Sequence, residues 1–119
     1  KGGGAIVNIS SVLGLKPQGL PQAAYASSKA GVIGLTRDLA AQWTGRKNIR
    51  VNALAPGFFP SEMSDELPKD MVNMIKMFTP AGRLGDPEEL AATLIWLVSD
   101  ASSYVTGITV PVDGGLVMP

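Results

Sequence analysis

The stretch IRVNALAPG, residues 49–57, combines a strand with the two residues that end it. Ile49–Ala55 is predicted to be a strand, and the Pro-Gly pair behind it is a strong breaker of regular structure. Upstream, AIVNIS at Ala5–Ser10 is β-branched and largely apolar, which is typical of a buried strand in a parallel sheet. Downstream, Ile108–Val112 is the third predicted strand.

A helix is predicted between the first two strands, from about Ala24 to Trp43. Gly45 and Asn48 behind it fit a helix stop. Gly31 and Gly34 lie inside the predicted helix, where a glycine costs up to about 1 kcal/mol relative to alanine. We therefore expect the helix to pack closely against a neighbour at these two glycines.

Two more helices are predicted between the second and third strands. Asp70–Phe78 is the first, short and rich in methionine. The second begins at Asp86-Pro87-Glu88-Glu89, with Asp as N-cap and acidic residues in the first turn, and runs to about Val98. Strands thus alternate with helices, which predicts an α/β fold with a parallel sheet and right-handed crossovers. Because three strands make a small sheet, we expect the chain to be part of a larger fold.

The composition of the 119-residue chain excludes several classes of function. Its ten basic and ten acidic residues give zero net charge, whereas nucleic-acid-binding proteins usually have a basic excess. The sequence has no cysteine or histidine, which excludes disulfides, the common zinc sites and every histidine base. Its apolar runs are far shorter than the roughly 20 residues of a membrane span, and it opens on no secretory signal. We therefore expect no metal, no nucleic acid, no membrane and a cytoplasmic location.

Tyr25 and Lys29 are the first candidates for chemistry. They are four residues apart on the predicted helix and therefore share one face. An ammonium group nearby favours the phenolate form of a tyrosine, so that the phenol can exchange protons near neutral pH. By itself, however, this spacing is more typical of an ordinary helix with an exposed lysine.

The placement of this pair favours a functional interpretation. Ser10-Ser11 and Pro56-Gly57 follow two neighbouring parallel strands, and the loop that leads to Tyr25 leaves the same sheet edge. In open α/β sheets, ligands bind outside the carboxyl ends of the strands. A serine hydroxyl at that edge can donate a hydrogen bond to a carbonyl oxygen on which negative charge develops.

Further motifs follow in order along the whole chain. They are ISSVLG at 9–14, YASSKAG at 25–31, VNALAPG at 51–57, GRLGDPEE at 82–89, TG at 106–107 and DGG at 113–115. With these motifs the sequence resembles the short-chain dehydrogenase/reductase family, most closely its 3-oxoacyl-carrier-protein reductase type. The resemblance implies the C-terminal half of a Rossmann-like, doubly wound parallel sheet.

The resemblance also implies catalytic roles for Ser11, Tyr25 and Lys29. Ser11 matches the serine that orients the substrate, with Ser10 as the competing assignment. Tyr25 matches the acid/base. Lys29 matches the residue that favours the phenolate and holds the nicotinamide ribose.

The cofactor contacts that the resemblance implies also include the loop after the second strand. Pro56 and Gly57 match the loop that lies against the nicotinamide, and Phe59 matches a backbone contact to its carboxamide. Ser61 stands where threonine is common and keeps the hydroxyl. The implied cofactor is NAD or NADP, and the implied substrate is a small carbonyl compound or secondary alcohol. The intact enzyme is expected to be a homotetramer or homodimer. The alternatives are a sugar or steroid dehydrogenase of the same family and a non-catalytic binding fragment.

Members of the family are longer than this chain, so residues 1–119 match a single partial domain, the catalytic half. The dinucleotide loop, the residue that selects NAD or NADP and a catalytic asparagine belong to the other, N-terminal half. Gly2–Gly4 precedes a strand, whereas a phosphate-binding loop follows a strand and opens a helix. We therefore interpret Gly2–Gly4 as an entry loop and predict that this chain alone is inactive.

Four further groups of residues allow two interpretations each. A turn with positive φ or a ligand loop is indicated for Asp113-Gly114-Gly115. A soft substrate lid or ordinary packing is indicated for Met63, Met71, Met74 and Met77. A docking patch for an acidic carrier protein or a solvated helix end is indicated for Arg46, Lys47 and Arg50. Core or subunit-interface positions are indicated for Trp43 and Trp96.

Overall fold

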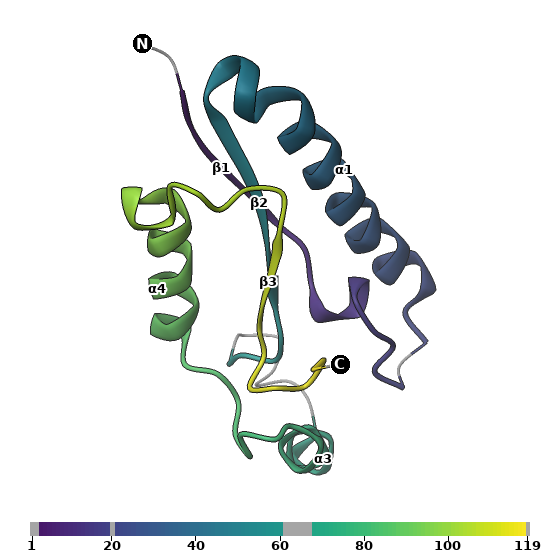
Figure 1. Cartoon of the computed structure of the whole chain (residues 1–119). Coiled ribbons are helices and arrows are strands. Elements are labelled where there is room, and N and C mark those ends of the chain that lie inside the picture. The colour runs from purple at the N-terminus through teal and green to yellow at the C-terminus, as the bar shows by residue number, and fades with distance from the viewer. Residues whose placement is uncertain (1–2, 20, 61–67, 119) are drawn as a thin grey trace.

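The computed structural model describes residues 3–19, 21–60 and 68–118. In this part of the chain, strands and helices alternate (Figure 1). The elements are β1 Gly4–Ile9, the 3-10 turn η1 Val12–Gly14, α1 Ala23–Lys47, β2 Ile49–Pro56, α3 Lys69–Phe78, α4 Pro87–Val98, the 3-10 turn η2 Asp100–Ser102 and β3 Thr109–Val112. The predicted α/β fold with a parallel sheet is confirmed.

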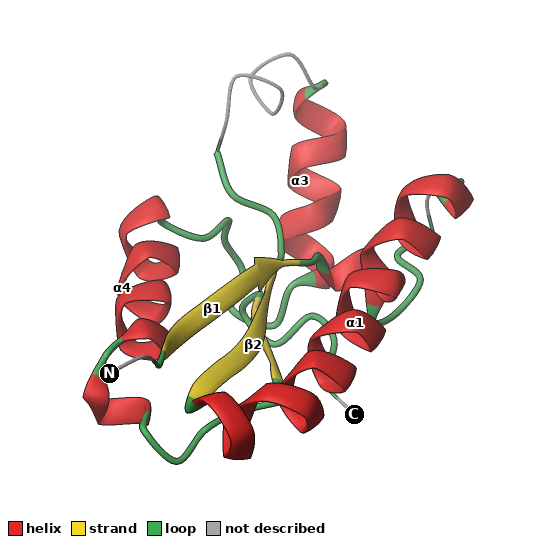
Figure 2. Cartoon of the chain, turned by 90° about the horizontal axis from the view of Figure 1, so that it is seen from above, coloured by secondary structure: helices red, strands yellow, loops and turns green. Residues whose placement is uncertain are grey.

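The middle strand, β2, forms the core of the described molecule. The strand order is β1-β2-β3, and both pairings are parallel. Residues 51–55 of β2 are all buried, with Val51, Ala53 and Ala55 at 0% exposure. Seen from above in Figure 2, α1 and α4 lie on opposite sides of the sheet, so β2 is covered on both faces. This arrangement explains why residues 51–55 of β2 are apolar except at one position.

That one polar position is Asn52, whose side chain holds the segment that leads into β3. Its amide donates to the carbonyl oxygen of Val105 (3.0 Å) and accepts from the backbone N–H of Ile108 (3.2 Å). Both polar ends of this buried side chain are therefore satisfied. The contact fixes where β3 begins, and with it the loop that follows β3.

The end of α1 differs from the prediction. The helix continues to Lys47, so Gly45 lies inside it and is not a stop. Asn48 ends the helix in the left-handed region, with φ of 56°, and its N–H reaches the carbonyl oxygens of Thr44 and Trp43. Asparagine tolerates this conformation better than other residues with a side chain. One of the two proposed stop signals was therefore wrong and the other is confirmed.

In the described part of the chain, Gly31 and Gly34 pack closely against no neighbour. Both glycines are exposed, and a Cβ added at either would meet no atom within 4 Å. By contrast, Gly14 in η1 does make a close contact with α1: a Cβ there would lie 2.8 Å from the backbone carbonyl carbon of Lys29. A side chain at Gly14 would push η1 away from α1.

Arg50 does not share the exposed surface on which Arg46 and Lys47 lie. Arg46 and Lys47 are exposed in the last turn of α1, as expected of a solvated helix end. The Arg50 guanidinium instead turns inward and donates to the carbonyl oxygens of Ser99 (3.1 Å), Ser102 (2.8 Å) and Val105 (3.2 Å). It satisfies carbonyl groups that are left over where α4 and η2 end. The interpretation as a solvated helix end is therefore supported for Arg46 and Lys47 but not for Arg50.

At the edge of the described sheet, β1 pairs with β2 on one side. Ile6 and Ile9 of β1 are 37% and 49% exposed. Of the two tryptophans, Trp43 of α1 is partly buried and Trp96 of α4 is 40% exposed. Within the described ranges, no helix is both long and apolar enough to cross a membrane.

Candidate active site

The carboxyl ends of β1 and β2 meet the N-terminal half of α1. The backbone N–H of Ser10 donates to the carbonyl oxygen of Leu54 (2.8 Å), so the chain leaves β1 beside the end of β2. The turn η1 then packs on α1 through Gly14. Residues from three segments are thereby held at one edge of the sheet, where open α/β folds bind ligands.

Lys29 connects this sheet edge to Tyr25. Its ammonium donates to the carbonyl oxygen of Ile9 (3.2 Å), which is the last residue of β1. The same Nζ lies 5.6 Å from the centre of the Tyr25 ring, within the range of a cation–π contact. The Tyr25 side chain remains 44% exposed. The structure thus holds a positive charge next to an accessible phenol, as the spacing of the two residues predicted.

Two adjacent serines at the end of β1 use their hydroxyl groups differently. Ser10 is 2% exposed and donates its hydroxyl hydrogen to the carbonyl oxygen of Lys29 (2.8 Å). Ser11 is 7% exposed, and its oxygen accepts from the backbone N–H of Leu13 (3.2 Å) as the N-cap of η1. A hydroxyl that accepts still has one hydrogen to donate. The hydroxyl hydrogen of Ser10 is therefore used inside the fold, whereas that of Ser11 is not used by this contact.

The loop after β2 is fixed from one side by β3. The N–H of Gly57 donates to the carbonyl oxygen of Val112 (2.9 Å), next to the pairing of Pro56 with Val112. A Cβ on Gly57 would lie 2.8 Å from the Cβ of Asp113, so a side chain there would force the two segments apart. Of the remaining cofactor residues predicted in this loop, Phe59 is partly buried and Ser61 lies outside the described residues.

The turn interpretation of Asp113-Gly114-Gly115 is supported by the backbone. Gly114 and Gly115 have φ of 67° and 94°, which favour glycine. The Asp113 carboxylate accepts from the N–H groups of Gly115 (3.0 Å) and Val117 (2.9 Å). Its oxygens are thus used in holding the turn. The predicted methionine-rich segment is exposed on α3, where Met71, Met74 and Met77 are 38%, 55% and 83% exposed, and Met63 lies outside the described residues.

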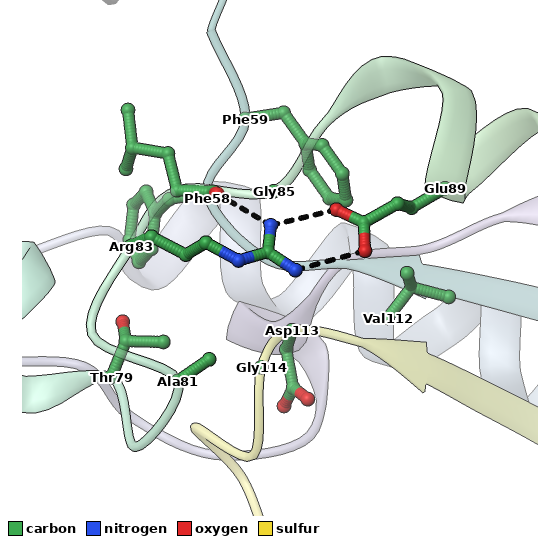
Figure 3. Close-up of a pocket in the computed structure, with 11 residues that line it drawn as sticks. Phe58, Phe59, Thr79, Ala81, Arg83, Gly85, Glu89, Val112, Asp113 and Gly114 are labelled. Carbon is green, nitrogen blue, oxygen red and sulfur yellow. Dashed lines mark hydrogen bonds and ion pairs between the residues drawn. The ribbon is translucent and has the colours of Figure 1, made fainter.

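An ion pair that was not predicted from the sequence lies beside the loop after β2 (Figure 3). The Arg83 guanidinium binds both carboxylate oxygens of Glu89, at 2.8 and 2.9 Å. Glu89 also accepts from the N–H of Asp86 (2.9 Å), which completes a capping box at the start of α4. The hydrogen bonds from Arg83 and from the Asp86 backbone lower the pKa of Glu89 to about 2, and the same pairing raises the pKa of Arg83. The acidic residue at the third position of the predicted helix was the one signal for this contact.

A small hollow opens next to this ion pair, at some distance in sequence from the Tyr25 segment (Figure 3). It is lined by residues of the loops after β2, α3 and β3 and by one residue each of β3 and α4, namely Phe58, Phe59, Thr79, Ala81, Arg83, Leu84, Gly85, Glu89, Val112, Asp113 and Gly114. None of Ser11, Tyr25 and Lys29 lines it. In the described part of the chain, no group of three or more acidic side chains is arranged to hold a metal ion.

The chain is similar to known proteins over nearly its whole length. The family described as enoyl-(acyl-carrier-protein) reductase matches residues 1–117. A 3-oxoacyl-[acyl-carrier-protein] reductase of Thermotoga maritima is 51% identical over 116 residues, which are 97% of this chain and 46% of the relative. The human (3R)-3-hydroxyacyl-CoA dehydrogenase is 47% identical over 115 residues, which are 97% of this chain and 43% of that protein. The chain therefore spans less than half the length of these curated relatives.

Solved structures match over the same extent. The crystal structure of a 3-oxoacyl-[acyl-carrier protein] reductase from Brucella melitensis superposes with a TM-score of 0.91 at 43% identity, covering 97% of this chain and 42% of that one. A gluconate 5-dehydrogenase from Burkholderia cenocepacia, solved in complex with NADP and tartrate, gives a TM-score of 0.87 at 40% identity, covering 96% and 45%. With the family match over residues 1–117, these likenesses show that the chain belongs to the short-chain dehydrogenase/reductase family.

Proposed function

We propose that the protein containing this chain is an NAD(P)-dependent oxidoreductase that interconverts a carbonyl compound and a secondary alcohol. These 119 residues would form its catalytic half. The observation that carries the proposal is the position of the Lys29 ammonium, between the last carbonyl of β1 and the ring of an accessible Tyr25. A cation beside an accessible phenol supports the assignment of Tyr25 as acid/base, and the pair lies at the sheet edge where ligands bind.

The chemistry assigns one task to each side chain. A nicotinamide cofactor held by Lys29 and the loop after β2 would supply a hydride for the carbonyl carbon. The Tyr25 hydroxyl donates its proton to the carbonyl oxygen, so that the product is a secondary alcohol. Ser11 donates a hydrogen bond to the same oxygen as negative charge develops on it. Lys29 favours the phenolate that remains and would hold the nicotinamide ribose.

The loop after β2 is proposed to contact the nicotinamide. Pro56, Gly57 and Phe59 would supply these contacts, together with the hydroxyl of Ser61. Gly57 packs tightly against Asp113 and donates a hydrogen bond to Val112. These two contacts fix the start of the loop and support its proposed role in binding the nicotinamide. The remainder of a dinucleotide site would come from a segment outside this chain.

A 3-oxoacyl thioester is the substrate class that we propose, because relatives named for 3-oxoacyl, 3-hydroxyacyl and acetoacetyl substrates recur among the similar proteins. Rates of NADH and NADPH oxidation with an acetoacetyl thioester, compared with those for a sugar ketone, test both the substrate class and the cofactor. We also propose that the intact enzyme is a homotetramer or homodimer and that it is located in the cytoplasm.

Replacing Tyr25 by phenylalanine in the intact enzyme tests the central assignment. Loss of the proton donor is expected to lower kcat by roughly 10²–10⁴-fold, the usual contribution of general acid–base catalysis, while NAD(P)H still binds. Steady-state turnover and nicotinamide fluorescence give the two readouts. Tyr104→Phe is the matched control, because Tyr104 is fully exposed and lies outside this site. Turnover close to that of the unmodified enzyme in Tyr25→Phe would refute the role of Tyr25.

A further inference from the structure

The loop that follows β2 is tied to the rest of the fold at two backbone positions. On one side, the N–H of Gly57 donates to the carbonyl oxygen of Val112 (2.9 Å). On the other side, the carbonyl oxygen of Phe58 accepts from the N–H of Gly85 (3.0 Å). Gly85 lies between α3 and α4, far away in the sequence. The position of Phe58 and Phe59 therefore depends on the segment that contains Gly85.

Gly85 also provides the surface on which the Phe59 ring rests. A Cβ placed on Gly85 would lie 2.3, 2.6 and 2.7 Å from three carbons of that ring. Real Cβ atoms do not approach other atoms so closely, so any side chain at Gly85 would displace the ring. Gly85 is not among the residues with positive φ. The requirement for glycine at this position is therefore one of space and not of backbone conformation.

The segment that carries Gly85 is itself held firmly. Arg83 donates hydrogen bonds from its two terminal guanidinium nitrogens to the carboxylate of Glu89 in α4, and one of them also donates to the carbonyl oxygen of Leu84 (3.2 Å). On the other side of Gly85, Asp86 forms the capping box of α4. Figure 3 shows the Phe59 ring next to Gly85 and the ion pair. The ring consequently packs against a segment that is tied to the first turn of α4.

We infer that Gly85 is a positioning residue for the cofactor: by leaving room for the Phe59 ring, it sets the position of the Phe59 backbone that is proposed to contact the nicotinamide. This inference rests on the proposed function, which assigns the Phe59 backbone to the carboxamide. It extends that function to a residue that itself touches neither substrate nor cofactor.

Gly85→Ala in the intact enzyme tests the inference. Phe58 and Phe59 both line the small hollow, so the ring and its backbone have space to shift together and the variant is expected to fold. Its KM and Kd for NAD(P)H are expected to rise about five- to tenfold, because the displaced ring shifts the backbone that is proposed to contact the nicotinamide. The kcat at saturating cofactor is expected to change little. Gly45→Ala is the matched control, because a Cβ on Gly45 meets no atom within 4 Å.

A double-mutant cycle with Phe59→Ala separates positioning from a general loss of structure. If the ring transmits the effect, Gly85→Ala should raise the cofactor Kd much less in the Phe59→Ala background than in the unmodified enzyme. An unchanged Kd in Gly85→Ala, or equal effects in both backgrounds, would overturn the inference. If Gly85→Ala does not fold, Phe59→Ala alone must raise the cofactor Kd, and an unchanged Kd would overturn it equally. Failure of the proposed function can be told apart from failure of this inference. In that case Tyr25→Phe would leave the turnover of the enzyme unchanged, whatever the effect of Gly85→Ala.

Discussion

Ser10 and Ser11 are neighbours with the same side chain, and the fold gives their hydroxyl groups different tasks. The Ser10 hydroxyl hydrogen is directed at the Lys29 carbonyl inside the molecule. Ser11 accepts one hydrogen bond, from Leu13, and keeps its own hydrogen. The motif alone could not separate the two residues on physical grounds, because the difference comes from α1, which packs on the end of β1.

This difference predicts opposite effects of two alanine substitutions in the intact enzyme. Ser10→Ala removes a buried hydrogen bond and is expected to lower the free energy of unfolding by about 0.5–1.5 kcal/mol while kcat is kept. Ser11→Ala is expected to lower kcat roughly 10²–10³-fold, as loss of a donor to a developing oxyanion does. Denaturant unfolding and steady-state kinetics on the same two preparations measure this. A larger fall of kcat in Ser10→Ala than in Ser11→Ala would reverse the assignment.

At the scale of elements, local signals predicted most of the structure. Apolar runs gave the strands to within one residue, and Asp86-Pro87 gave the start of α4. What the sequence could not indicate were contacts between distant segments. Arg50 meets the carbonyl groups of residues 99–105, and Gly85 meets the ring of Phe59. Such contacts depend on how the elements pack, and no local sequence pattern around Arg50 or Gly85 predicts them.

The first turn of α4 gives a prediction about pH. The pKa of Glu89 is lowered to about 2 from an ordinary value of 4.5, by Arg83 first and by the Asp86 N–H second. Because the folded value lies below the unfolded one, the carboxylate stabilises the fold above about pH 4.5 and this contribution is lost as the pH falls toward 2. Glu89→Gln should therefore lower the Tm at pH 7, and the difference from the unmodified protein should shrink steadily below pH 4.5.

Glu88→Gln is the matched control for this prediction. Glu88 is in the same exposed first turn, and its N–H, not its carboxylate, takes part in the cap. The substitution removes the same charge from the same helix end without touching Arg83. Thermal unfolding at several pH values compares the two variants. An equal loss of Tm in both, or a Glu89→Gln difference that does not vary with pH, would contradict the role given to the ion pair.

At the scale of the whole molecule, the described sheet ends at β1. The strand pairs with β2 on one side only, and Ile6 and Ile9 are 37% and 49% exposed. An open strand edge with apolar side chains promotes association with other chains. The chain also matches only 42–46% of the length of its relatives in the comparisons above. Both facts bear on what a polypeptide of these 119 residues would do alone.

We expect that polypeptide to associate and to show no micromolar affinity for NAD(P)H. It carries the proposed contacts to the nicotinamide, but the phosphates and the adenosine would have no site, so most of the binding energy of a dinucleotide would be missing. Sedimentation velocity measures the association, and titration by nicotinamide fluorescence measures the affinity. Ile6→Lys places a charge on the open edge and should shift the polypeptide toward monomer, since edge lysines oppose strand pairing. Micromolar NAD(P)H binding by the polypeptide would show that these residues hold a complete cofactor site.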